Sequence, residues 1–111
     1  MSIVQTGPLA VRHSFAAKLA DDLSLPDIRQ VLAAFAQDLD RLTAGLAGAG
    51  DAAAFRRAAH ALCGAAGAVG AMRLASLCRD AARPELPAIL HEAGGIRTEL
   101  GRVLTWLDRH G

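Results

Sequence analysis

The sequence predicts an all-α protein, an antiparallel four-helix bundle with a short additional N-terminal helix. Three observations predict this fold: alanine, leucine and arginine dominate, β-branched residues are sparse, and apolar positions recur at three- and four-residue steps. Hydrophobic residues make up 52% of the chain but aromatic residues only 4%, so the core is expected to be aliphatic. With 111 residues, the chain is expected to form one domain over residues 1–111.

The first half of the chain predicts two helices. A short helix is expected over residues 8–20, since a proline at position 8 suits an opening helical turn. Ser24, with Asp27 three residues on, resembles an N-terminal cap before a second helix over residues 25–47. The apolar residues of this second helix form one continuous stripe: Ile28, Leu32, Phe35, Leu39, Leu42 and Leu46.

Two further helices are expected in the middle of the chain. Asp51 can cap a third helix over residues 52–68, and Gly70 interrupts the chain after it. A fourth helix is expected over residues 71–83, because the prolines of "RPELP" disfavour a helical residue before them. Its expected buried residues are Leu74, Leu77 and Cys78.

The last helix is expected to begin near Glu85. Gly94 and Gly95 are a point where it could loosen or split, because each glycine costs roughly 1 kcal/mol relative to alanine. Its expected core residues are Leu86, Leu90, Ile96, Leu100, Val103 and Leu107. Short links between the helices favour antiparallel packing, with the N-terminal helix as a lid.

Charge and hydropathy argue against several classes of partner. The chain has 12 basic and 11 acidic residues, a formal net charge of +1, which argues against nucleic acid and anionic membrane surfaces. The N-terminus lacks a basic region followed by a long apolar stretch, and no stretch reaches the roughly 18 uncharged apolar residues of a bilayer span. A cytoplasmic protein is therefore expected.

The third predicted helix places a histidine on its exposed face. With about 100° per residue and Phe55 as the origin, the buried stripe lies within roughly 40°. This stripe comprises Ala59, Leu62, Ala66 and Val69. His60 lies about 140° from Phe55 on the same wheel, so we expect it to face solvent.

The neighbours of His60 indicate a docking face. Residues three and four positions apart share a helix face, and those around His60 are Arg56, Arg57, Cys63, Gly64 and, one turn further, Gly67. Two exposed mid-helix glycines cost about 0.5 to 1 kcal/mol each relative to alanine, so their use favours close approach of a partner. The two arginines suit an anion held near the ring, although ordinary solvated helix charges would look the same.

The stretch "AHALCGAAGAVGAMRLASLC" resembles the histidine-containing phosphotransfer (HPt) domain. The family pattern runs His, any residue, Leu, Lys, Gly, then small residues, a Gly ten positions after the His, and a Leu-Cys pair. The residues that match in identity and order are His60, Leu62, Gly64, Gly70, Leu74, Leu77 and Cys78. The resemblance implies a four-helix bundle whose exposed histidine, here His60, accepts a phosphoryl group from a receiver-domain aspartate and passes it to another receiver.

The resemblance also implies what the protein binds. Its expected partners are response-regulator receiver domains, with a hybrid histidine kinase among the candidates, and a monomer is expected. No cofactor is expected on this chain, because the receiver would bring the metal ion, Mg²⁺, and the charge-stabilising groups. The resemblance implies no nucleotide site of its own either, which agrees with the absence of a glycine-rich phosphate loop with its lysine.

Two departures from the family pattern bear on the site. Cys63 stands where the family commonly has lysine, and a neutral thiol cannot balance phosphoryl charge. Arg56 or Arg57, one turn away, is a hypothetical replacement. Alanines at positions 81 and 82 stand where the family often has Leu-Glu, which would remove a polar neighbour of the histidine.

Four other functions are open at this point. An adapter would bind receivers without transferring phosphate. A metal or redox site could use His60 and Cys63, but a structural zinc needs four ligands, and Cys63 and Cys78 are expected to be reduced thiols, Cys78 in the core. A sensor-kinase dimerisation domain would need an adjoining ATP-binding domain. An enzyme that acts on a small substrate would need a second titratable cluster beside His60.

The other histidines of the chain are expected at the surface: His13, His91 and His110. Trp106 is expected to be a packing residue, and Met72 to be either a packing or a surface residue.

Overall fold

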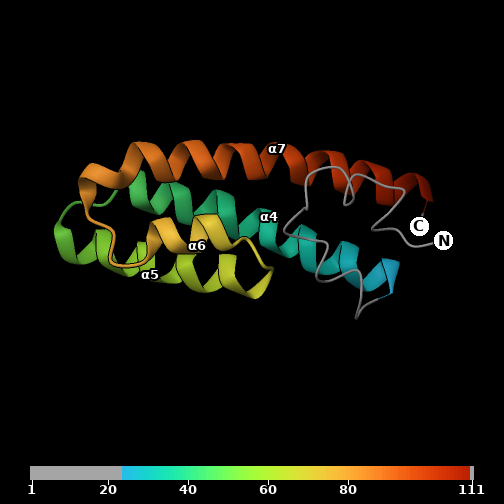
Figure 1. Ribbon diagram of the computed structural model, residues 1–111, viewed down its shortest axis with the longest axis horizontal. Helices are drawn as coiled ribbons and strands as arrows, with labels where there is room; N and C mark the ends of the chain where they lie inside the picture. Colours follow the sequence, from blue (N-terminus) through green and yellow to red (C-terminus); the bar gives the residue numbers. More distant parts are fainter. Residues whose placement is uncertain (1–23, 111) are drawn as a thin grey trace.

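The computed structural model describes residues 24–110, which form an all-α bundle in which consecutive helices run antiparallel (Figure 1). Its elements are α4 (Leu25–Ala47), α5 (Ala52–Ala68), α6 (Met72–Cys78), a 3-10 turn η1 (Arg83–Glu85) and α7 (Leu86–His110). The predicted four-helix bundle is confirmed. The short helix predicted over residues 8–20 and the residue His13 lie outside the described residues.

Side-chain caps begin the first two helices where the sequence predicts them. The Ser24 hydroxyl accepts a hydrogen bond from the Asp27 backbone N–H at 3.4 Å. The Asp51 carboxylate accepts one from the Ala54 N–H at 2.7 Å. Each bond satisfies a backbone donor that has no partner within the helix, so the predicted bounds 25–47 and 52–68 are confirmed.

The fourth helix is shorter than predicted. It ends at Cys78 rather than at residue 83, and Asp80 follows with φ 55°, a left-handed conformation that stops helix propagation. The chain resumes at η1, where the Ala82 N–H donates to a Glu85 carboxylate oxygen at 3.0 Å. Leu77, predicted to be buried, is only half-buried. The prolines therefore begin the next helix instead of ending this one.

All six apolar residues predicted for α4 are buried, but two positions predicted for α7 are wrong. Leu90 is 37% exposed and Leu86 is half-buried, whereas Ile89 and Ala93 are buried. The helix is unbroken through Gly94 and Gly95, so the core face extends back from Ile96 in steps of three and four residues. That register places residues 93 and 89 inward and residue 90 about 100° away.

Ion pairs join the two long helices at the surface. Arg97 of α7 pairs with Asp40 of α4 at 3.0 Å, and Arg29 of α4 pairs with Asp108 near the end of α7. A third pair, Arg73 with Glu92 at 3.0 Å, ties α6 to α7. No helix among the described residues is long and apolar enough to cross a membrane.

We expect the carboxyl of Asp108 to titrate below its usual range. The side-chain hydrogen bond from Arg29 is the main cause that lowers this pKa, although both groups are about half exposed. Because the folded-state pKa is lowered, the pair stabilises the fold above the unfolded pKa and loses that contribution as pH falls through the folded pKa. NMR titration of Arg29→Gln should show the Asp108 pKa rising, whereas Arg41→Gln, which breaks a pair elsewhere on α4, should not move it. An unchanged midpoint in Arg29→Gln would contradict the assignment.

Candidate functional site

His60 lies at the middle of α5 and is exposed to solvent, as the helical wheel predicts. The buried stripe on the opposite side of the helix is confirmed: Phe55, Ala59, Leu62 and Ala66 are at most 2% exposed, and Val69 is 4% exposed. Packing of this stripe against the core fixes the rotation of α5. The imidazole is therefore held outward by the burial of its neighbours.

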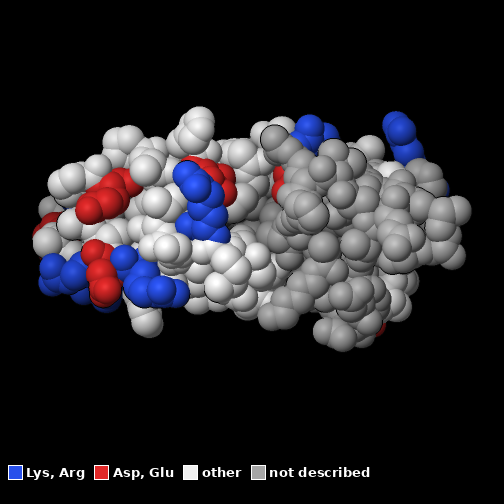
Figure 2. Space-filling view, viewed as in Figure 1, with Lys and Arg blue, Asp and Glu red and all other residues white. Residues whose placement is uncertain are grey.

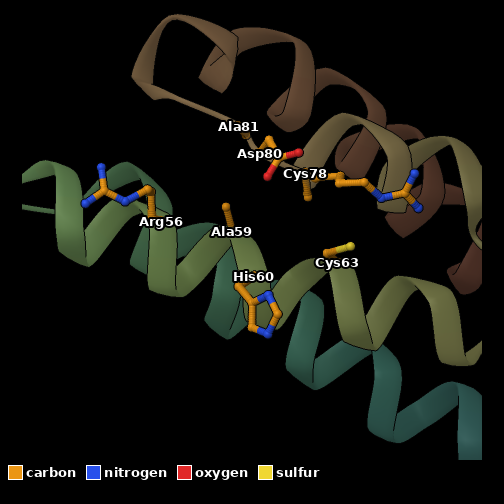
Figure 3. A pocket seen from close by; sticks show the side chains of 8 residues that line it. Arg56, Ala59, His60, Cys63, Cys78, Asp80 and Ala81 are labelled. Atoms are coloured by element: carbon orange, nitrogen blue, oxygen red, sulfur yellow. The ribbon is translucent and has the colours of Figure 1, made fainter.

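An open cavity of about 260 Å³ lies beside the imidazole, between α5 and the segment that ends α6. Its lining residues are Arg56, Ala59, His60, Cys63, Cys78, Arg79, Asp80 and Ala81. Figure 3 shows Ala59 and Cys63 on the α5 side, and Cys78, Asp80 and Ala81 on the facing side. His60 stands at the outer edge of the cavity, with its ring directed away from the α6 side.

The structure divides the predicted site residues into two groups. Arg56 and Cys63 line the cavity together with His60. Arg57, Gly64 and Gly67 do not line it, and the helix period places Arg57 and Gly64 on the other side of the imidazole.

The two glycines on this face have no packing reason to be glycine. A Cβ added at Gly64 or at Gly67 would meet nothing within 4 Å. The backbone conformation at both positions is helical, so left-handed freedom is not required there either. The absence of side chains therefore leaves an open surface beside His60.

Two polar residues of the cavity, Arg79 and Asp80, were not predicted from the sequence. The alanines at positions 81 and 82 add no polar group to the cavity, but α6 ends early and the turn that follows brings Arg79 and Asp80 to it. The signal that could have found them is an aspartate shortly before "AARP", since aspartate tolerates the left-handed conformation better than most residues.

Charges of both signs surround the cavity. Arg56 and Arg79 bring positive charge and Asp80 negative charge, and the Arg56 guanidinium is turned away from the imidazole along α5 (Figure 3). On the face seen in Figure 2, basic and acidic side chains are likewise interspersed among the coloured residues. The site therefore has no single-sign field of its own among the described residues.

The two thiols are free, and they differ in environment. Cys63 is half-buried, whereas Cys78 is 1% exposed. Burial raises the pKa of the Cys78 thiol to about 11, with a smaller contribution from Cys63. Both predictions for the cysteines, free thiols and a core position for Cys78, are confirmed.

The structure gives no support to a metal centre at this site. Within residues 24–110, no group of three or more His, Cys, Asp or Glu side chains could hold a metal ion.

Other residues for which the sequence predicts a position lie outside the cavity. His91 is exposed on α7 as predicted, Trp106 packs against the core as predicted, and Met72 is 60% exposed. The side chain of His110 lies outside the described residues.

Residues 26–106, which include all of α5, α6 and the cavity, match the Hpt domain family. The chain belongs to the Hpt domain family. No curated protein and no solved structure gives a significant match. HPt domains are phosphotransfer modules of two-component phosphorelays that interact with receiver domains, and they are not classical enzymes.

Proposed function

We propose that this HPt domain accepts a phosphoryl group on His60 from an aspartyl phosphate of one receiver domain and passes it to an aspartate of another. The observation that carries the proposal is the exposure of His60 at the middle of α5, beside two glycines whose missing side chains leave the surface open. A receiver can thus bring its aspartate close to the imidazole without a clash.

The chemistry needs little from this chain beyond position. An imidazole nitrogen attacks phosphorus, the N–P bond forms, and the P–O bond to the receiver aspartate breaks. The carboxylate keeps the electron pair of that bond, and the imidazole gives up a proton to solvent. We propose that the receiver supplies Mg²⁺ and the charge-stabilising groups, and that the chain acts in the cytoplasm as a monomer without a cofactor of its own.

The test is to mix the protein with each phosphorylated receiver domain of the source organism. We expect acid-labile phosphate to appear fast and selectively on this chain when it is mixed with its phosphorylated cognate receiver. The phosphorylated chain should then pass the phosphoryl group on to a second, unphosphorylated receiver. Binding to a phosphorylated receiver without any transfer would overturn the proposal and favour the adapter.

We expect Arg56→Ala to shorten the lifetime of phosphohistidine more than Arg57→Ala does. Arg56 lines the same cavity as His60 and can reach a phosphoryl group by rotation of its flexible side chain, whereas Arg57 lies on the other side of the ring. The expected difference is about threefold to tenfold, the size of a solvent-exposed charge interaction of roughly 1 kcal/mol. Time courses of acid-labile phosphate loss measure it. Equal lifetimes in both variants would show that Arg56 does not replace the missing family lysine.

We expect Gly64→Gln to slow transfer by at least tenfold while the fold is kept. The side chain would stand in open space on α5, where it can obstruct the receiver without disturbing the core. Gly64→Ala should raise the free energy of unfolding by about 0.5 to 1 kcal/mol. The matched control is Gly95→Gln on α7, where a Cβ also meets nothing within 4 Å; it should leave transfer unchanged. Equal rates for Gly64→Gln and Gly95→Gln would contradict a docking role for Gly64.

A further inference from the structure

The cavity beside His60 brings together the two cysteines of the chain. Cys63 lines it from the middle of α5, and Cys78 lines it from the last residue of α6. Figure 3 places the Cys63 side chain on the α5 side of the cavity and Cys78 on the facing side. Both are free thiols, and the proximity of Cys63 contributes, after burial, to the raised pKa of Cys78. Phosphoryl transfer, as proposed above, has no use for two thiols at this place.

We propose that Cys63 and Cys78 form a redox-active dithiol, which a low-molecular-weight disulfide oxidises to an intramolecular disulfide that slows phosphoryl transfer at His60. The formation of the bond stands on the cavity alone. Its effect on transfer rests on the proposed function of His60.

The oxidation is a pair of thiol–disulfide exchanges. The Cys63 thiolate attacks one sulfur of the small disulfide, forms a mixed disulfide and releases the first small thiolate. The Cys78 thiolate then attacks the Cys63 sulfur, forms the protein disulfide and releases the second. Two protein thiols lose two protons and two electrons, and the small disulfide takes them up to become two small thiols. Excess small thiol reverses both steps.

The order of the two steps follows from exposure. Cys63 is half-exposed to solvent and can meet the oxidant, whereas the buried Cys78 can only meet Cys63 across the cavity. Because the Cys78 pKa is about 11, only a small fraction of Cys78 is thiolate near neutral pH. When the attack of Cys78 on the mixed disulfide limits the rate, the rate of disulfide closure follows the fraction of Cys78 that is thiolate. This rate should therefore rise about tenfold per pH unit between pH 7 and pH 9.

The position of the bond explains its effect on the site. A disulfide holds its two sulfur atoms about 2.05 Å apart and constrains the backbones on either side. Here it would join α5, one turn after His60, to the segment that carries Arg79 and Asp80. α6 has only seven residues and no side-chain cap at its start, so it is the element that can shift to allow the bond. The bond would cross the cavity and fix the facing segment beside the imidazole.

Oxidised glutathione and intact-mass spectrometry test the bond on the whole chain. We expect the native protein to become lighter by two hydrogen atoms, with no glutathione retained, and proteolysis to release a peptide that joins Cys63 to Cys78. Cys78→Ala should instead keep one glutathione on Cys63, and Cys63→Ser should not react while it is folded. A stable glutathione adduct on the unsubstituted protein, or no reaction, would overturn the dithiol.

Phosphoryl transfer from the cognate receiver tests the regulation. The oxidised protein should accept phosphate at least tenfold more slowly than the reduced protein, with the rate restored by excess small thiol. In Cys63→Ser, whatever its own rate, glutathione treatment should change nothing. Equal rates for the oxidised and reduced protein would overturn the regulatory role. If the reduced protein accepts no phosphate from any receiver, the proposed function fails, and the regulatory role with it, whereas the mass measurement still decides the disulfide.

Discussion

Replacing His60 with glutamine should abolish acid-labile phosphate on the chain after exposure to its cognate phosphorylated receiver. Glutamine keeps a polar side chain at an exposed helical position, so the fold should be unaffected. Its amide nitrogen is not a nucleophile, however, so no N–P bond can form. Transfer should fall to the detection limit, a larger effect than any substitution around the ring should have. Radiolabelled phosphate retained after alkali and lost after acid measures it.

His91→Gln is the matched control for this prediction. His91 is also exposed and helical, but it lies on α7 and does not line the cavity. This variant should accept phosphate at the unsubstituted rate. Wild-type labelling of His60→Gln would place the acceptor at another residue. Loss of labelling in His60→Gln with unchanged receiver binding would separate transfer from docking.

The largest effect on stability is expected from Phe55→Ala, at about 3 to 5 kcal/mol of unfolding free energy. Phe55 is 1% exposed and begins the buried stripe that sets the rotation of α5. Removing the ring leaves a cavity in a core otherwise made mainly of aliphatic side chains. Because small domains have only about 5 to 15 kcal/mol of stability, this loss is a large fraction of the total. Urea unfolding followed by circular dichroism measures the change.

Arg83→Met provides the control for Phe55→Ala. The Arg83 guanidinium lies 5.8 Å from the centre of the Phe55 ring, and it also donates to the Ala49 carbonyl. Methionine keeps most of the apolar stem and removes the charge, so the expected loss is only about 1 kcal/mol. A loss in Phe55→Ala no greater than that in Arg83→Met would show that the ring is not a main anchor of α5.

Local signals made the first two described helices and the exposure of His60 predictable. The caps at Ser24 and Asp51 act within three residues of the positions they stabilise, and the stripe from Phe55 to Ala66 repeats with the helical period. Both kinds of signal can be read without knowing what the helix packs against. The outward direction of the imidazole follows from them.

The far side of the cavity was not predictable by the same means. The position of Asp80 depends on a left-handed residue that is not glycine, which local propensity disfavours. The burial of Ile89 in place of Leu90 depends on α7 staying continuous through Gly94 and Gly95, and packing rather than propensity decides that. Arg79 and Asp80 therefore reach the site through tertiary structure.

The two left-handed residues, Gly70 at φ 82° and Asp80 at φ 55°, bracket α6 and interrupt the helical conformation on both sides of it. A change in the length or sequence of a helix is normally transmitted along its register to the residues that follow. Here the register is interrupted on both sides, so changes within α6 need not rotate α5 or α7. Substitutions at the exposed positions of α6 should therefore leave the rotation of α5, and with it the outward direction of His60, unchanged.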